Sequence, residues 1–352
     1  MSNWEKNVRL VTPYTPGEQP KEKVIKLNTN ENPYKPAKAV YDVLKNFDAT
    51  DLRLYPDPSV TELIDALSDT YGVPIDQIFV GVGSDDVLAM SFMTFFNSER
   101  PVLFPDITYS FYDVWAEEFR IPYETKALDE DFHVVPSDYK APNGGIVLPN
   151  PNAPTGIAEG IDFYEKIVGA NPDSVVIIDE AYVDFGADSM LPLIDRYDNL
   201  LVVRTFSKSR SLAGSRIGYA FGSKKLIKYL NDVKYSFNSY TMDALTIKLG
   251  TAVLSEPDYF EETVDKIIDT REWFKSELKN LGFTFGDSKT NFVFATHKSV
   301  SAAELFEALK KNGIFVRYFN KPRIDNYLRI TIGTREEMES LLSFFENYPG
   351  IK

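Results

Sequence analysis

The sequence contains no cysteine, and its 352 residues include only two histidines, His133 and His297. The absence of cysteine excludes disulfides, thiolate nucleophiles and thiolate metal sites. Two histidines that stand far apart in the sequence give little material for a histidine-based metal centre or a Ser-His-Asp relay. We therefore expect no metal site.

The sequence also lacks long apolar runs and an excess of positive charge. No run approaches the roughly 18 apolar residues that a membrane helix needs, and residues 1–7 lack the apolar core of a signal peptide. We therefore expect a cytoplasmic protein. The formal net charge of −14 argues against nucleic acid or an anionic membrane as the main partner, because both attract basic surfaces. A small-molecule substrate is the expected partner.

Two short apolar runs, at residues 175–178 and 200–203, are typical of buried parallel strands. Asp179 follows the first run directly, and Lys208 lies just beyond the second. Because open α/β sheets bind ligands at the carboxyl ends of their strands, we expect both side chains at one edge of a sheet. Either residue alone would usually be a helix cap or a solvated loop side chain. Together they indicate a site.

A third residue, Arg216, completes a set of side chains that suits one cofactor. A lysine amine condenses with carbonyl groups, a carboxylate can keep a pyridine nitrogen protonated, and an arginine with nearby hydroxyl groups can hold a phosphate dianion. Lys208, Asp179 and Arg216 supply these three functions, with Thr205 and Ser207 as the hydroxyl groups. Pyridoxal 5'-phosphate needs all three.

The same stretch resembles the core of the fold-type I, aspartate-aminotransferase-like pyridoxal phosphate enzymes. The similar segments are Asp-Glu-Ala-Tyr at residues 179–182, Thr-Phe-Ser-Lys at 205–208 and Leu-Ala-Gly-Ser-Arg-Ile-Gly-Tyr at 212–219. The resemblance is greatest to the histidinol-phosphate aminotransferases and extends from about residue 14 to residue 333. It implies a homodimer with shared active sites, and Lys208, Asp179 and Tyr182 as catalytic residues.

The resemblance also implies a complete set of cofactor-binding residues. Residues 81–86, Gly-Val-Gly-Ser-Asp-Asp, match a phosphate cup in which backbone N–H groups at a helix N-terminus bind the anion. Tyr109 matches a tyrosine that stacks on the cofactor ring, and Tyr55 matches one that reaches the phosphate in the neighbouring subunit. The implied set is Ser84, Asp85, Tyr109, Asn152, Asp179, Tyr182, Thr205, Ser207, Lys208 and Arg216, with Tyr55 contributed across the dimer.

One segment departs from the family pattern. Most relatives have Asn-Pro-Thr-Gly, in which the asparagine next to the proline binds the phenolic oxygen of the cofactor. This chain has Ala153 at that place and Asn152 one residue earlier. Either a local backbone shift brings Asn152 to the oxygen, which we favour, or Tyr182 alone binds it.

The resemblance implies substrate residues as well, namely Tyr14, Asn30, Arg317 and Arg329. The family uses arginines in the last two segments for the anionic tail of the substrate, which suits their planar guanidinium groups. The implied reaction is ping-pong transfer of an amino group between L-histidinol phosphate and 2-oxoglutarate in histidine biosynthesis. An aminotransferase for aromatic or other amino acids, a threonine-phosphate decarboxylase and a nucleotide-binding α/β protein remain alternatives.

The order of the predicted elements indicates an α/β protein in three parts. We expect an N-terminal arm at residues 1–35 and a large, three-layer αβα domain with a mostly parallel sheet at 36–240. A small α+β domain follows at 241–352 and begins with a linking helix. Within the large domain, the pattern of Ser59 and Glu62 predicts a capping box at the start of a helix.

Overall fold

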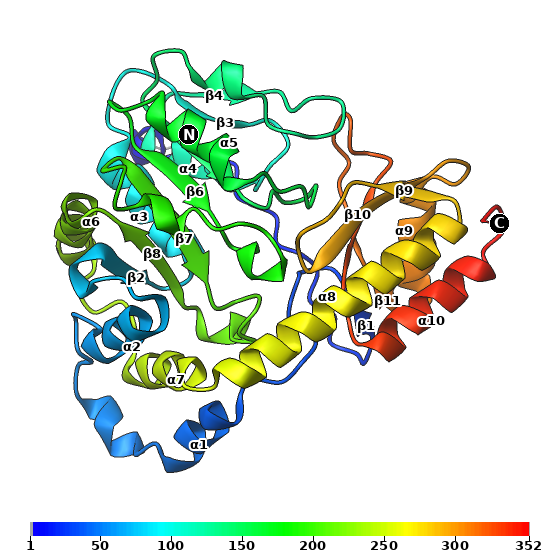
Figure 1. Ribbon diagram of the computed structural model, residues 1–352, viewed down its shortest axis with the longest axis horizontal. Helices are drawn as coiled ribbons and strands as arrows, with labels where there is room; N and C mark the ends of the chain where they lie inside the picture. The colour runs from blue at the N-terminus through cyan, green and yellow to red at the C-terminus, as the bar shows by residue number, and fades with distance from the viewer. Residues whose placement is uncertain (1–2, 352) are drawn as a thin grey trace.

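The computed structural model describes residues 3–351 and has an α/β fold with two main sheets of different size (Figure 1). The strands of the larger sheet are β2 (Ile78–Gly81), β3 (Val102–Pro105), β4 (Tyr123–Lys126), β5 (Gly145–Pro149), β6 (Val176–Asp179), β7 (Leu200–Thr205) and β8 (Gly218–Gly222). They lie in the order β2-β8-β7-β6-β5-β3-β4. Strand β8 runs antiparallel to both of its neighbours, and the other pairs are parallel, so the expected mostly parallel sheet is confirmed.

Helices cover both faces of the larger sheet because successive strand residues point to opposite faces. Ile177 and Leu201 pack in one apolar core, whereas their neighbours Ile178 and Val202 pack in another. The first core includes residues of α3 (Ser84–Phe95), α4 (Tyr112–Phe119) and α6 (Lys224–Phe237). The second includes residues of α1 (Lys38–Asn46), α2 (Thr61–Tyr71), α5 (Ile161–Gly169) and α7 (Ala244–Leu254). The expected three-layer architecture is therefore confirmed.

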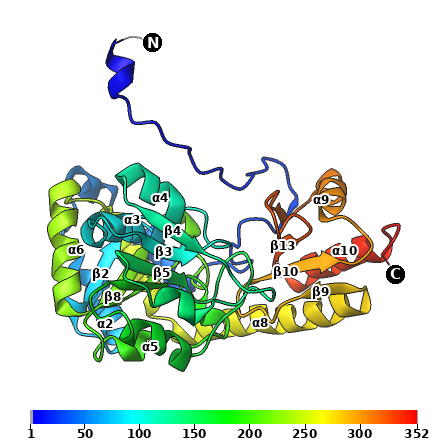
Figure 2. The same cartoon turned by 90° about the horizontal axis from the view of Figure 1, so that it is seen from above.

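The smaller part of the molecule has its own core and an antiparallel sheet in the order β12-β13-β10-β9. Its elements are α8 (Pro257–Asn280), β9 (Phe283–Phe285), β10 (Phe292–His297), α9 (Ala302–Lys311), β11 (Ile314–Phe315), β12 (Arg317–Tyr318), β13 (Leu328–Thr331) and α10 (Arg335–Glu346). The short strand β1 (Ile25–Lys26) pairs with β11, so the N-terminal segment is joined to the C-terminal part. Figure 2 shows residues 3–24 outside the two sheets as a largely extended segment, and its Tyr14 ring stacks on that of Phe111.

Short 3-10 helices occupy several of the connections. They are η1 (Asn3–Asn7), η2 (Ala49–Arg53), η3 (Ile75–Gln77), η4 (Pro136–Tyr139), η5 (Val183–Phe185), η6 (Leu191–Leu193) and η7 (Ala213–Ser215). None of the helices in the described residues is long and apolar enough to cross a membrane.

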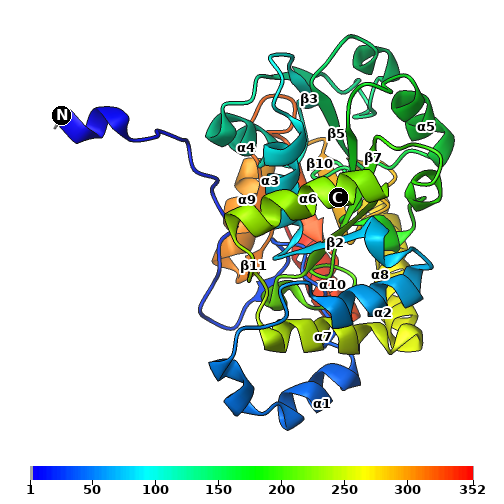
Figure 3. The ribbon, with the colours of Figure 1, turned by 90° about the vertical axis from the view of Figure 1, so that its left-hand side faces the viewer.

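Two local features differ from the simplest interpretation of the sequence. The helix α7 lies beside α1 and α2, as Figure 1 and Figure 3 show, and α8 is the helix that continues into the smaller part. The predicted domain boundary near residue 241 stays a prediction. The capping box is wrong, because α2 begins at Thr61 and the Asp57 carboxylate accepts the N–H groups of Ser59 and Thr61 at 2.9 and 2.8 Å.

A buried ion pair joins the end of β6 to β7. The Arg204 Nε donates to Glu180 Oε2 at 2.9 Å, and both side chains are almost fully buried. Glu180 also accepts bonds from the Ser189 hydroxyl and the Met190 N–H group. Burial raises the pKa of Glu180, although Arg204 stabilises its charged form. Removing one partner would leave the other charge buried without compensation.

We predict that Glu180→Gln lowers the free energy of unfolding by about 3–5 kcal/mol, because buried Arg204 loses its nearer counter-charge and keeps only Asp184, at 3.9 Å. The matched control is Glu262→Gln, which breaks the solvent-exposed pair with Lys266 on α8 and should cost at most about 1 kcal/mol. Urea unfolding of the cofactor-free protein measures both. Equal losses in the two variants would contradict the importance of the buried pair.

Candidate active site

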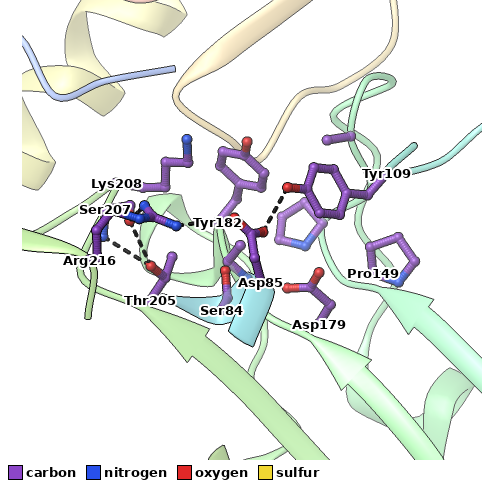
Figure 4. Close-up of a pocket in the computed structure, with 13 residues that line it drawn as sticks. Ser84, Asp85, Tyr109, Pro149, Asp179, Tyr182, Thr205, Ser207, Lys208 and Arg216 are labelled. Atoms are coloured by element: carbon purple, nitrogen blue, oxygen red, sulfur yellow. Dashed lines mark hydrogen bonds and ion pairs between the residues drawn. The ribbon is translucent and has the colours of Figure 1, made fainter. Parts of the chain in front are cut away.

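The residues predicted to bind the cofactor gather in one cavity at the carboxyl edge of the larger sheet (Figure 4). Strands β5, β6 and β7 end at this edge, and the antiparallel β8 begins there, because Thr205 pairs with Gly218. The cavity is lined by Ser84, Asp85, Tyr109, Pro149, Pro151, Ala153, Asp179, Ala181, Tyr182, Thr205, Ser207, Lys208 and Arg216. Two of the predicted cofactor residues, Asn152 and Tyr55, are absent from this lining.

One end of the cavity is built to hold an anion. Helix α3 begins at Ser84, and the preceding Gly83 provides no side-chain cap for its first N–H groups. Gly83 has a φ of +85°, and a Cβ there would lie 2.4 Å from an Arg216 nitrogen. Gly218 allows a second close approach, because its Cβ would meet the Ser84 nitrogen at 2.2 Å. The two glycines therefore bring the guanidinium group and the helix N-terminus together, which favours phosphate.

Hydroxyl groups and a carboxylate complete this end of the cavity. The Ser207 hydroxyl accepts a bond from the Thr205 hydroxyl at 3.0 Å and a long one from Arg216 at 3.4 Å. The Asp85 carboxylate accepts one bond from the Tyr109 hydroxyl at 2.8 Å and another from Arg216 at 3.1 Å. Asp85 thus connects the tyrosine ring at one wall to the guanidinium group at the other.

Asp179 lies at the floor of the cavity, as predicted from its place at the end of β6. Its Oδ2 accepts a bond from the Tyr112 hydroxyl at 2.8 Å, and its Oδ1 accepts one from the Ala181 N–H group at 3.1 Å. Burial raises the pKa of Asp179 to about 6, although both hydrogen bonds favour the charged form. A protonated nitrogen in the cavity would supply the cation that this buried carboxylate otherwise lacks.

Lys208 stands where this cavity meets a second one. Its Nζ donates to the carbonyl oxygen of Thr29 at 3.2 Å and lies 5.6 Å from the centroid of the Tyr182 ring. The Tyr182 hydroxyl accepts a bond from the Asn30 side chain at 2.8 Å. Lys208, Tyr182 and Tyr109 line both cavities. The amine can therefore act on a group held in either one.

The second cavity contains all the predicted substrate residues, namely Tyr14, Asn30, Arg317 and Arg329. Arg329 donates to the Asn28 carbonyl oxygen at 3.0 Å, but its buried Nε has no partner among residues 3–351. Burial lowers the pKa of Arg329, and the nearby charge of Arg317 adds to this effect. An anion between the two arginines would satisfy the free N–H donor and offset the repulsion.

The structure does not bring Asn152 into the cofactor cavity. Its amide nitrogen donates to the Ile107 carbonyl oxygen at 2.9 Å and to the Thr155 hydroxyl at 3.0 Å. Its oxygen accepts a bond from the Thr108 hydroxyl at 3.1 Å. Asn152 therefore fastens its own loop to the segment of Ile107 and Thr108, and the geometry fits the alternative in which Tyr182 alone binds the phenolic oxygen.

Tyr55 lies outside the cavities of its own chain. Its side chain is 83% exposed, and its ring lies 4.7 Å from that of Tyr240. Tyr55 therefore lines neither cavity of its own chain. The sequence analysis missed Tyr112, the partner of Asp179, although it follows Tyr109 in the same segment and begins α4.

The cavity residues fit pyridoxal phosphate. The helix N-terminus with Arg216 suits the phosphate, the buried Asp179 suits the pyridine nitrogen, and Lys208 supplies the amine. No group of three or more histidine, cysteine, aspartate or glutamate side chains in residues 3–351 is placed to hold a metal ion.

Comparison with known proteins agrees with the fit of the cavity to pyridoxal phosphate. The family model for aminotransferase class I and II matches residues 22–345. The histidinol-phosphate aminotransferase of Lactococcus lactis subsp. cremoris (strain SK11) is 51% identical over 347 residues, which cover 98% of each chain. The solved structure of histidinol-phosphate aminotransferase from Sinorhizobium meliloti in complex with pyridoxal-5'-phosphate has a TM-score of 0.83 at 23% identity, covering 92% of this chain and 90% of that one. L-threonine-O-3-phosphate decarboxylase from Porphyromonas gingivalis has a TM-score of 0.77 at 21% identity, covering 92% and 98%.

We predict that the burial of Asp179 destabilises the cofactor-free protein above acidic pH. The folded chain retains this proton up to about pH 6, whereas the unfolded chain loses it near 3.8, so stability falls as pH rises through this interval. The loss amounts to about 3 kcal/mol. Asp179→Asn removes the titration. The unfolding free energy of the variant minus that of the wild type should therefore increase by a similar amount between pH 4 and pH 7.

Urea unfolding of both cofactor-free proteins across this pH range tests the prediction. Any hydrogen bond that Asp179→Asn weakens contributes equally at every pH, so only the change in the difference with pH is compared. A difference that stays constant would refute the assignment of the burial cost to Asp179. The same variant should bind pyridoxal phosphate more weakly than the wild type.

Proposed function

Because the chain belongs to the class I and II aminotransferase family, we propose that it transfers an amino group between L-histidinol phosphate and 2-oxoglutarate by a ping-pong mechanism. The observation that carries this proposal is the second cavity, which is lined by Lys208, Arg317 and Arg329 and in which the Arg329 Nε has no partner among residues 3–351. The name of the Lactococcus lactis relative, which is 51% identical over nearly the full length, supports the choice of substrate. The products are glutamate and imidazole acetol phosphate.

The enzyme uses pyridoxal phosphate, which supplies an electron sink for the charge left on the substrate carbon when its proton is removed. In our proposal, Lys208 binds the cofactor covalently and, once displaced, moves the proton, since it is the only lysine among residues 3–351 that lines either cavity. Asp179 holds the pyridine nitrogen protonated from the cavity floor. Tyr109 would form the wall against the ring, and the Tyr182 hydroxyl would donate a hydrogen bond to the phenolic oxygen.

The two arginines provide the binding energy for the substrate. Histidinol phosphate carries a phosphate dianion, and 2-oxoglutarate carries two carboxylates, so both reactants need cationic partners. Arg329 is half-buried and donates to the Asn28 carbonyl oxygen, whereas Arg317 donates to the carbonyl oxygen of Thr15 at 3.2 Å. Asn30 donates a hydrogen bond to the Tyr182 hydroxyl and so orients this ring. Tyr182 lines both cavities and would therefore lie between the substrate and the cofactor.

We predict that the purified enzyme with bound cofactor forms glutamate from 2-oxoglutarate when it is given histidinol phosphate. Arg329→Met should lower kcat/KM for histidinol phosphate by about 10²-fold, because charge-assisted hydrogen bonds to the phosphate are lost. Cofactor absorbance should be unchanged in this variant, which separates substrate binding from cofactor binding.

The same assay includes threonine phosphate, tyrosine and phenylalanine. A higher kcat/KM for tyrosine or phenylalanine would replace the proposed substrate by an aromatic one. Release of CO₂ from threonine phosphate would indicate a decarboxylase instead. A purified protein that takes up no pyridoxal phosphate would overturn the whole assignment.

We further propose that the enzyme is a homodimer in which Tyr55 of one subunit binds the cofactor phosphate of the other. Tyr55 is highly exposed although it is aromatic. Leu52 and Leu54, which lie near it in sequence, and Phe237, which lies near Tyr240, are apolar and exposed as well. Exposed apolar side chains that gather on one surface mark protein interfaces, and the contact between the Tyr55 and Tyr240 rings brings two of them together. The cytoplasmic location expected from the sequence stays a prediction.

We predict that Tyr55→Phe weakens pyridoxal phosphate binding by about one to two decades, because one charge-assisted hydrogen bond of about 1.5–3 kcal/mol is lost. Mixing this variant with the inactive Lys208→Ala variant should restore activity. In each hybrid dimer, one site combines an intact Lys208 with an intact Tyr55 from the other subunit. An active monomer, or no recovery after verified subunit exchange, would disprove the shared site.

A further inference from the structure

Arg323 connects the two parts of the molecule next to the substrate cavity. It lies in the loop between β12 and β13, the strands that carry the two substrate arginines. Its guanidinium group reaches three acceptors in the larger part: Asp106 Oδ2 at 3.1 Å, the Leu128 carbonyl oxygen at 2.9 Å and the Asp129 carbonyl oxygen at 2.6 Å. A single side chain thus holds this loop against the ends of β3 and β4.

The backbone around this contact is strained on both sides. Arg323 has a φ of +68°, and Phe132, whose ring centroid lies 5.7 Å from the Arg323 guanidinium carbon, has a φ of +69°. Neither residue type favours the left-handed region, which suits glycine and, less well, asparagine or aspartate. Strain of this kind persists only where the surroundings impose it, and it collects at functional sites. Here two such residues meet across the boundary between the two parts.

The contact joins two segments that both supply residues to the lining of the substrate cavity. Asp106 precedes the segment with Thr108 and Tyr109, and its Oδ1 accepts the Leu128 N–H group at 3.0 Å. On the other side, the loop of Arg323 begins next to Phe319, whose ring centroid lies 5.5 Å from the guanidinium carbons of both substrate arginines. Arg323 and Asp106 also line a cleft that shares several residues with the substrate cavity.

We propose that Arg323 is a positioning residue that fixes the two substrate arginines relative to Lys208 by fastening their loop to the segment of Tyr109. An arginine suits this role, because its planar fork can bind a carboxylate and two carbonyl oxygens at once, which a lysine ammonium cannot do in the same geometry. The pair with Asp106 is partly exposed, and such pairs add little to stability. The effect of Arg323 therefore falls on substrate binding.

The inference rests on the proposed aminotransferase reaction but not on the identity of its phosphate-bearing substrate. It is tested with glutamate alone in the half-reaction, followed by the absorbance of the enzyme-bound cofactor. Arg323→Ala should raise the half-saturating glutamate concentration about tenfold, leave the maximal rate within about threefold and leave the affinity for pyridoxal phosphate within about twofold, because the anion contacts are misplaced while the cofactor site is intact. Arg323→Lys should recover only part of the loss.

Two further variants distinguish positioning from general damage. Arg196→Ala removes an exposed arginine that pairs with Glu165, away from both cavities, and should change neither half-saturation nor rate. Asp106→Asn should reproduce part of the effect of Arg323→Ala, and the double variant should be no worse than Arg323→Ala alone, since both act through one contact. Amide hydrogen exchange in residues 319–324 should be faster in Arg323→Ala.

An unchanged half-saturating concentration in Arg323→Ala would overturn the proposal. So would a parallel loss of cofactor affinity and thermal stability, or full additivity with Asp106→Asn. If histidinol phosphate proves not to be the substrate, the glutamate half-reaction still reports on Arg323. The proposed function and this inference can therefore fail separately.

Discussion

The carboxylate of Asp179 is the constraint on which the rest of the site depends. In the proposed function it is buried to meet a ring nitrogen inside the protein, and burial opposes its charge, as its raised pKa indicates. Tyr112 and the Ala181 N–H group fix its direction but do not neutralise it. The neighbouring Glu180 is also buried, yet it has Arg204 as a counter-ion. Adjacent carboxylates at one strand end thus serve different purposes: one is compensated within the fold, and the other is left for a ligand.

The sheet topology explains why these side chains meet although they come from distant parts of the sequence. Parallel strands β5, β6 and β7 deliver their carboxyl ends to one edge, and the antiparallel strand β8 starts there. Pairing of Gly81 with Gly218 brings the turn before α3 to the same edge. Because Gly218 has no side chain, that turn can approach closely enough for Arg216 and the N-terminus of α3 to face one anion. The reversal of one strand is therefore part of how the phosphate end is assembled.

The sequence was most informative where the residues of the site lie close together along the chain. Lys208 and Arg216 could be predicted because they follow one strand within a few residues, and Asp179 because it ends an apolar run. The order of apolar runs and helical patterns also indicated the layers. Asn152 could not be placed, because its amide group binds Ile107 and Thr108 in a distant segment. Tyr112 was missed because its bond to Asp179 joins the first residue of α4 to the end of β6, which is far away in sequence. The capping box failed because the Asp57 carboxylate, two residues before Ser59, accepts the first N–H group of the helix instead.

Two anion sites separated by one amine account for the arrangement of the cavities. The first combines backbone N–H groups and Arg216, which are fixed to the larger sheet, whereas the second uses arginines of the smaller part. A cofactor phosphate needs a rigid place so that its ring stays aligned with Asp179. The substrate arginines lie instead on strands β12 and β13 of the smaller part. Their position relative to Lys208 therefore depends on contacts between the two parts. The N-terminal segment makes one such contact. The Tyr14 ring stacks on that of Phe111, with 4.2 Å between the ring centroids, and the carbonyl oxygen of the neighbouring Thr15 accepts a bond from Arg317.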